Sequence, residues 1–72
     1  MSLKPGIYQH YKGPLYRVDM VVTHSETEEE LVVYKALYGE RGMWARPLAM
    51  FTETVEVDNE TRPRFAYLRD KE

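Results

Sequence analysis

The chain of 72 residues contains no cysteine and only two histidines. The absence of cysteine excludes a disulfide framework, a thiolate nucleophile and a cysteine-ligated zinc site. Metal binding needs three or four converging ligands, and the two imidazoles, His10 and His24, fall far apart along the predicted strands. We therefore predict neither a metal site nor a cofactor.

Neither sign of charge dominates the chain, and no long apolar run is present. Ten basic residues stand against twelve acidic residues, which gives a net charge of −2. Proteins that bind duplex DNA neutralise many phosphates at once, so this balance argues against duplex DNA as a partner. No apolar stretch approaches the ~20 residues that span a bilayer, and no leader-like segment opens the chain. We expect a cytoplasmic protein without a membrane partner.

Aromatic residues supply the core in the absence of cross-links. The chain has six tyrosines, two phenylalanines and one tryptophan. A chain of this length buries only ~60% of the surface that it exposes when unfolded, which leaves room for a single core. We expect one small β domain over residues 1–72, with residues 69–72 as a charged, frayed tail.

Segments with a repeat of two residues predict strands over most of the chain. In residues 15–24 the even positions share the side that we interpret as inward, namely Tyr16, Val18, Met20, Val22 and His24. Residues 31–38 are apolar on both sides, as in a central strand. The other predicted strands are residues 7–11, 43–46, 55–57 and 64–68, with one helical turn at residues 48–51.

This order of elements is typical of a small SH3-like antiparallel barrel with one short helical turn. The alternative is an open antiparallel sheet that packs on itself or across a homodimer. It arises because a central strand that is apolar on both sides needs cover on both sides. Both architectures are mainly β.

The densest polar segment is residues 23–30, between two apolar stretches. His24 and Glu26 lie two residues apart, so in an extended chain they share a side and could form a general-base dyad. These two are the candidate catalytic residues, and they define the alternative function, a small hydrolase-like enzyme. The structural interpretation of the same segment is a turn with capping pairs, either Ser25 with Glu28 or Thr27 with Glu30.

A second candidate site combines arginines with aromatic residues. Guanidinium groups beside aromatic rings can hold a phosphate and stack a base, which is how single-stranded nucleic acid is often bound. The predicted ligand-binding residues are Tyr34, Trp44, Arg46 and Arg64. We expect Trp44 to lie beside the bend that carries His24. The alternative is that Trp44 belongs to the core and that the arginines pair with glutamates.

Seven short motifs lie in order between residues 6 and 67: His10-Tyr11-Lys12-Gly13, His24-Ser25-Glu26-Thr27, Val32-Val33-Tyr34, Leu37-Tyr38-Gly39, Trp44-Ala45-Arg46-Pro47, Met50-Phe51 and Pro63-Arg64-Phe65. Together they resemble the small bacterial family catalogued as domain of unknown function 1653. The resemblance implies a bacterial, stand-alone, cytoplasmic domain of mostly β structure, with no assigned activity and no functional residue to transfer.

The residues themselves therefore carry the leading functional hypothesis. It is a non-catalytic binding module that recognises an unknown small ligand, a peptide, a nucleotide or an RNA segment through an aromatic and arginine rim. The surplus of tyrosine favours this hypothesis, because such rings bring contact area at low entropic cost. A homodimer remains a further expectation.

Overall fold

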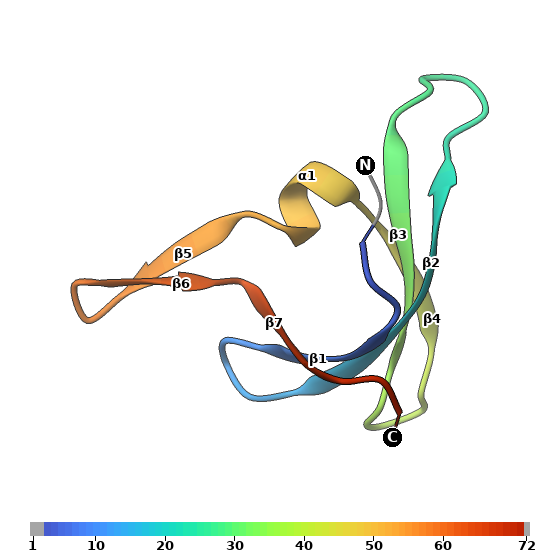
Figure 1. The fold of residues 1–72 in the computed structure, drawn as a ribbon. Helices are drawn as coiled ribbons and strands as arrows, with labels where there is room; N and C mark the ends of the chain where they lie inside the picture. The colour runs from blue at the N-terminus through green and yellow to red at the C-terminus, as the bar shows by residue number, and fades with distance from the viewer. Residues whose placement is uncertain (1–2, 72) are drawn as a thin grey trace.

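The computed structural model describes residues 3–71, and this range forms seven strands and one short helix (Figure 1). The strands are β1 (Gly6–His10), β2 (Leu15–Thr23), β3 (Glu30–Ala36), β4 (Met43–Pro47), β5 (Thr54–Val57), β6 (Glu60–Pro63) and β7 (Phe65–Arg69), and the helix is α1 (Leu48–Phe51). The mainly β class with one short helical turn is confirmed.

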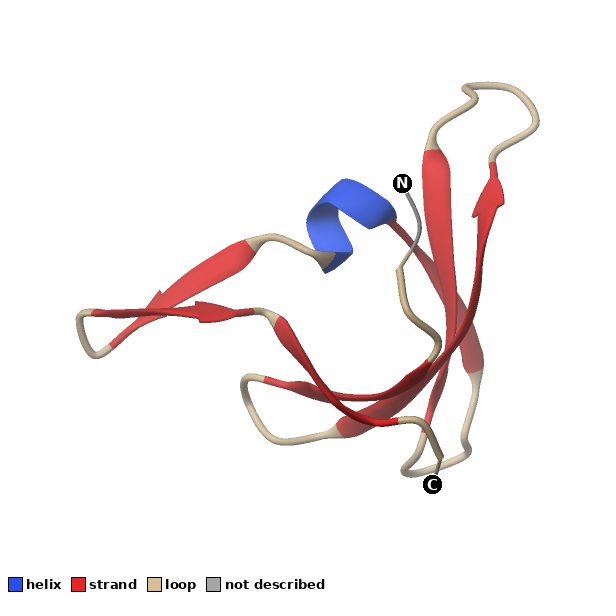
Figure 2. Ribbon diagram, viewed as in Figure 1, coloured by secondary structure: helices blue, strands red, loops and turns tan. Residues whose placement is uncertain are grey.

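Five of the strands form an antiparallel sheet in the order β4-β3-β2-β1-β7, and β5 pairs with β6 as a separate hairpin. Between β4 and β7 the chain makes α1 and this hairpin, which projects away from the sheet (Figure 2). Among residues 3–71, β4 and β7 are therefore the edges of the sheet and are not hydrogen-bonded to each other. The fold is the open antiparallel sheet, the alternative that the sequence predicted beside the closed SH3-like barrel.

The core lies on one face of this sheet, which we call the inner face. Six buried side chains form it: Tyr8, Val18, Val32, Tyr34, Phe51 and Phe65. The helix α1 contributes Phe51, whose ring stacks on Phe65 with 4.1 Å between the centroids and an angle of 3° between the planes. Leu48, three residues earlier, packs against the same cluster, as the predicted helical turn required.

The inward pattern predicted for β2 is wrong in its second half. The pairing with β3 shifts between Val18 and Met20, which marks a bulge. An extra residue in one strand reverses which side chains face inward from that point on. Val21 therefore packs against the core, while Met20 and Val22 are exposed.

The strand β6 was not predicted. Asp58 and Asn59 have φ values of 53° and 66°, the left-handed geometry of a tight two-residue hairpin turn. All four residues of β6 are exposed, and the segment shows no alternation of apolar and polar residues. The sequence therefore gave no indication of a strand there. Arg69, assigned to the charged tail by the sequence, is the last residue of β7, and Glu72 lies outside the described residues.

Candidate functional site

The two aromatic residues of the predicted rim sit side by side on the inner face. Tyr34 in β3 is the cross-strand partner of Trp44 in β4, so their side chains share a face. Tyr34 is only 6% exposed and touches the rings of Phe51 and Phe65, whereas Trp44 is 60% exposed. The alternative that placed Trp44 in the core is therefore wrong, and Tyr34, one of the predicted ligand-binding residues, is a core ring beside the exposed Trp44.

Arg46 lies two residues beyond Trp44 in β4 and faces the same way. It is half-buried opposite Val32, and its guanidinium carbon lies 5.7 Å from the centroid of the Phe65 ring. Within residues 3–71 it has no carboxylate partner. Arg46 thus places its positive charge over the Phe65 ring, on the same face as the exposed indole of Trp44.

Arg64 reaches the same place from the junction of β6 and β7. Its Nη2 donates to the Oε1 of Glu53 at 2.6 Å, and its backbone N–H donates to the carbonyl of Glu53 at 3.0 Å. Its own carbonyl accepts from the N–H of Tyr11 at 2.9 Å. The Nε of Arg64 is buried and has no acceptor among the described residues. The predicted pairing of arginine with glutamate holds for Arg64 but not for Arg46.

His10 joins these arginines, although the sequence had singled it out only as a potential metal ligand. Its ring lies 4.9 Å from Phe65, edge to face, and 4.6 Å from Tyr11. Burial lowers the pKa of the imidazole below its usual value, and the charges of Arg64, Arg46 and Lys12 lower it further. The side chain is therefore neutral near pH 7 and lies in a positive field.

The hydrogen bonds of His10 assign its tautomer. The Nδ1 atom accepts from the backbone N–H of Lys12 at 3.2 Å, in the turn after β1. A neutral imidazole that accepts at Nδ1 carries its proton on Nε2. His10 is thus a neutral donor between two cationic side chains. We call the set His10, Trp44, Arg46, Arg64 and Phe65 the aromatic–arginine face.

Two further tyrosines extend this face along the sheet. Tyr16 packs edge to face on Tyr34 and Phe65, and its hydroxyl lies 2.8 Å from that of the exposed Tyr38. Burial, and then the hydrogen bond with Tyr38, raise the pKa of Tyr16 to about 12. The Tyr16 hydroxyl therefore remains protonated at neutral pH and serves as a hydrogen-bonding group.

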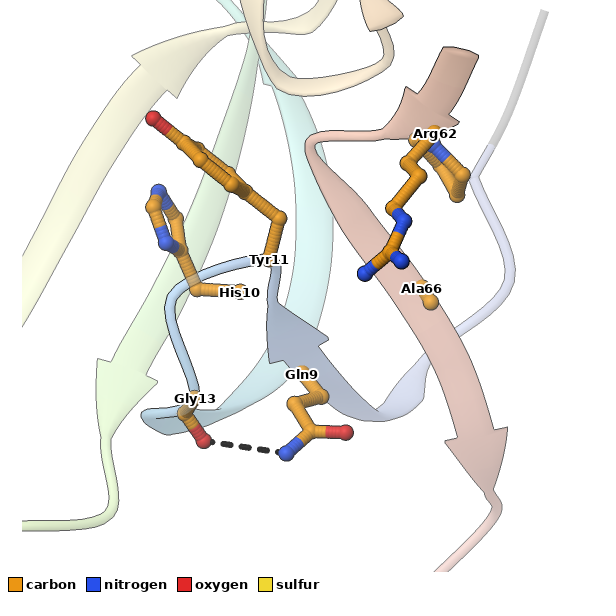
Figure 3. A pocket seen from close by; sticks show the side chains of 7 residues that line it. Gln9, His10, Tyr11, Gly13, Arg62 and Ala66 are labelled. Carbon is orange, nitrogen blue, oxygen red and sulfur yellow. Dashed lines mark hydrogen bonds between the residues drawn. The ribbon is translucent and has the colours of Figure 1, made fainter. Parts of the chain in front are cut away.

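A cavity of about 250 Å³ lies where β1 meets the β6–β7 segment, and His10 is one of its lining residues (Figure 3). Arg62 and Ala66 lie on one side of it, and Gln9 and Tyr11 lie on the other (Figure 3). Gln9 is fixed there because its Nε2 donates to the carbonyl of Gly13 at 3.1 Å. The remaining lining residues are His10, Gly13 and Pro63. Arg62 also bonds to Glu60, at 3.2 Å.

The candidate catalytic pair lies elsewhere and is organised as a turn. The Nδ1 of His24 accepts from the backbone N–H of Glu26 at 3.1 Å and of Thr27 at 3.3 Å. Thr27 in turn accepts from the N–H of Glu29 at 3.3 Å. No hydrogen bond joins the side chains of His24 and Glu26 in the described range, and the capping groups differ from the predicted Ser25–Glu28 and Thr27–Glu30 pairs.

Trp44 does not lie beside the His24 bend, so that expectation was wrong. Trp44 pairs with Tyr34, whereas His24 follows Thr23, which pairs with Glu30. Four residues of β3 separate the two positions, roughly 13 Å along the strand. Figure 1 shows the turn between β2 and β3 at the far end of the sheet from the turn between β3 and β4. The indole of Trp44 and the His24 turn are therefore two separate places, while Arg46, opposite Val32, lies two residues nearer to the turn along β3.

Comparison with known proteins identifies the family of this chain. The family described as "Protein of unknown function (DUF1653)" matches residues 6–67. This chain belongs to the DUF1653 family. A crystal structure of a DUF1653 protein from Bordetella bronchiseptica is 40% identical in sequence, with a TM-score of 0.87, and the match covers 94% of this chain and 90% of that one. No curated protein matches.

Neither a cluster of metal ligands nor a membrane-spanning helix is present among the described residues. In residues 3–71 of this DUF1653 protein, no group of three or more histidine, aspartate and glutamate side chains is placed to hold a metal ion. In the same range no helix has the length and apolar character needed to cross a bilayer.

Proposed function

We propose that this DUF1653 protein is a non-catalytic binding module for a ligand that carries both a phosphate and an aromatic base, a nucleotide or a short single-stranded RNA segment. One observation carries the proposal. Arg46, which has no carboxylate partner in the described range, lies over the Phe65 ring on the same face as the exposed Trp44. An unpaired guanidinium beside an exposed indole is the pairing that grips phosphate and base together.

Trp44 and Arg46 would bind different parts of the ligand, the base and the phosphate. The exposed face of Trp44 offers a stacking platform, which is worth ~1–3 kcal/mol per base and is tolerant of sequence. Arg46 and the neutral Nε2–H of His10 offer donors to a phosphate oxygen, with Arg64 as a further positive charge held by Glu53. Because His10 is neutral, it donates without adding a third full charge to the site.

The net charge of −2 limits this interaction to a local patch. Each phosphate contact with a single strand contributes roughly −0.7 to the slope of log affinity against log salt. With Arg46 and Arg64 as the contacts, we expect a slope of about −1.4, far shallower than that of a duplex-DNA binder. The preferred ligand is therefore short.

The lone tryptophan makes the test direct, because Trp44 is the only source of indole fluorescence in the chain. The protein is titrated with adenosine and uridine monophosphates, a single-stranded RNA hexanucleotide, inorganic phosphate and an uncharged peptide of similar length. We expect the nucleotide and RNA ligands to quench Trp44 in a saturable way. Quenching by the peptide alone, or no saturable change with any nucleotide or RNA, would contradict the proposal.

Arg46→Gln supplies the matched variant. A hydrogen bond to a charged group is worth about 1.5–3 kcal/mol, so we expect the dissociation constant for the RNA hexanucleotide to rise about tenfold or more. Arg69→Gln, which removes an exposed arginine from the end of β7, is the control and should leave the constant unchanged. Equal effects of the two substitutions would show that the binding is non-specific electrostatics.

A further inference from the structure

The sheet has a second face, which α1 and the core do not cover. Because Val32 and Tyr34 point into the core, Val33 between them points to the opposite side, which we call the outer face. Its cross-strand partners are Met20 in β2 and Ala45 in β4. Met20 is 53% exposed. Three neighbouring strands thus present an apolar row at the middle of the outer face.

The next row continues this apolar surface. Val22, Leu31 and Pro47 are cross-strand partners on the same face, and Val22 is also exposed. The bulge in β2 is what creates this surface, since it turns Met20 and Val22 outward. Contiguous exposed apolar side chains on a small protein mark an interaction surface.

Opposite charges stand at the two ends of the outer face. Arg17 and Lys35 are paired across β2 and β3 at one end, where Arg17 also forms an ion pair with Asp19 at 3.6 Å. Glu26, Glu28 and Glu29 lie in the turn at the other end. Lys35 and these three glutamates have no ion-pair partner in the part of the chain that the structure describes. Six residues separate Lys35 from Glu29, roughly 20 Å along an extended chain.

We infer that the outer face is the interface of a symmetric homodimer, with a second copy of this chain packed antiparallel on it. A twofold axis between the Val33 row and the Leu31 row, midway between Lys35 and Glu29, places the Lys35 end of each copy against the glutamate turn of the other. A parallel arrangement would instead oppose like charges. The surface is therefore complementary to itself, which identifies a second copy as the occupant.

The size of the patch sets the strength of the association. A standard interface buries ~800 Å² per partner. Three strands of five residues cover a smaller footprint, about 14 Å by 17 Å before the side chains are counted. We therefore expect a dissociation constant in the micromolar range, below the affinity of an obligate dimer.

Sedimentation equilibrium of the full chain, from about 1 to about 500 µM, spans that range. We expect the mass to rise from the 8.5 kDa of one chain toward twice that value. Met20→Glu should keep the chain monomeric throughout, while Met50→Glu, at an exposed methionine on α1, should dimerise like the parent. Circular dichroism of each variant should be measured as a control, to check that the variant is folded. A parent chain that stays monomeric, or equal effects of the two variants, would overturn the proposal.

Charge exchange tests the orientation of the two copies. Lys35→Glu and Glu29→Lys should each weaken the dimer about tenfold or more, because each opposes like charges at both ends of the interface. The double variant, and equally a mixture of the two single variants, should regain the parental constant. If neither regains it, the antiparallel arrangement is wrong. Nucleotide binding at the inner face is measured independently, so failure of one proposal is distinguishable from failure of the other.

Discussion

Trp44 and Arg46 are two residues apart in an edge strand, and their neighbours determine what each can do. The core ring of Tyr34 lies beside Trp44, and the Phe65 ring lies beneath Arg46. The sequence predicted both residues for the rim because guanidinium groups beside aromatic rings can hold a phosphate and stack a base. It could not predict His10, because the arginines that surround this imidazole come from other strands distant in sequence.

The lowered pKa of His10 predicts how stability depends on pH. The folded protein disfavours the charged imidazole, so the unfolded chain takes up the proton more readily. This contribution to stability is fully present above the unfolded pKa of about 6.5 and is lost as the pH falls below it. We expect urea denaturation to give a smaller free energy of unfolding at about pH 5.5 than at about pH 7.5.

His10→Asn isolates this contribution. The Oδ1 of asparagine can accept the same backbone N–H of Lys12 but does not titrate. We expect the variant to lose less stability than the parent between the two pH values. An identical loss in both proteins would show that His10 does not carry the pH dependence.

At the scale of elements, the sequence predicted every strand of the described range except β6, and it also missed an irregularity within β2. This irregularity is the bulge after Val18, and the strand β6 is exposed. A bulge is set by pairing with β3, and β6 exists because the turn at Asp58 and Asn59 folds it back on β5. Both depend on partners that a local repeat of residues does not reveal.

The short helix α1 is the element on which the core depends most. Phe51 is 1% exposed and contacts the rings of Tyr8, Tyr34 and Phe65. We expect Phe51→Ala to lower the free energy of unfolding by about 3–5 kcal/mol, since a buried aromatic ring is removed and a cavity remains. For a domain of this size, such a loss lowers the melting temperature by more than ~10 °C.

Met50→Ala is the control for that substitution, one residue earlier on the exposed side of α1. We expect it to change the free energy of unfolding by less than ~0.5 kcal/mol. Similar melting temperatures for the two variants would mean that α1 does not close the core.

At the scale of the whole molecule, the mainly β class followed from composition and from the repeat of two, but closure of the sheet did not. Closure would require hydrogen bonds between β4 and β7, which are separated by α1 and by the β5–β6 hairpin. The open sheet leaves the molecule with two usable faces. The inner face carries aromatic rings and arginines, and the outer face carries an apolar centre between opposite charges.

The two proposals assign different partners to the two faces of the sheet, the ligand to the inner face and a second copy of the chain to the outer face. A dimer through the outer faces would leave both aromatic–arginine faces accessible, one on each side of the assembly. Two such faces would bind two segments of a longer RNA at once, with an effective concentration set by the span between them. The interface and the ligand site are thus compatible in one assembly.

The most direct measurement of the central claim is a residue-resolved NMR titration with a single-stranded RNA hexanucleotide. We predict shifts concentrated on the indole N–H of Trp44, the guanidinium of Arg46 and the imidazole of His10. The turn that carries His24 should not shift, because it lies at the far end of the sheet (Figure 1). Shifts centred on His24 and Glu26, or none at any ligand concentration, would contradict a ligand site on the aromatic–arginine face.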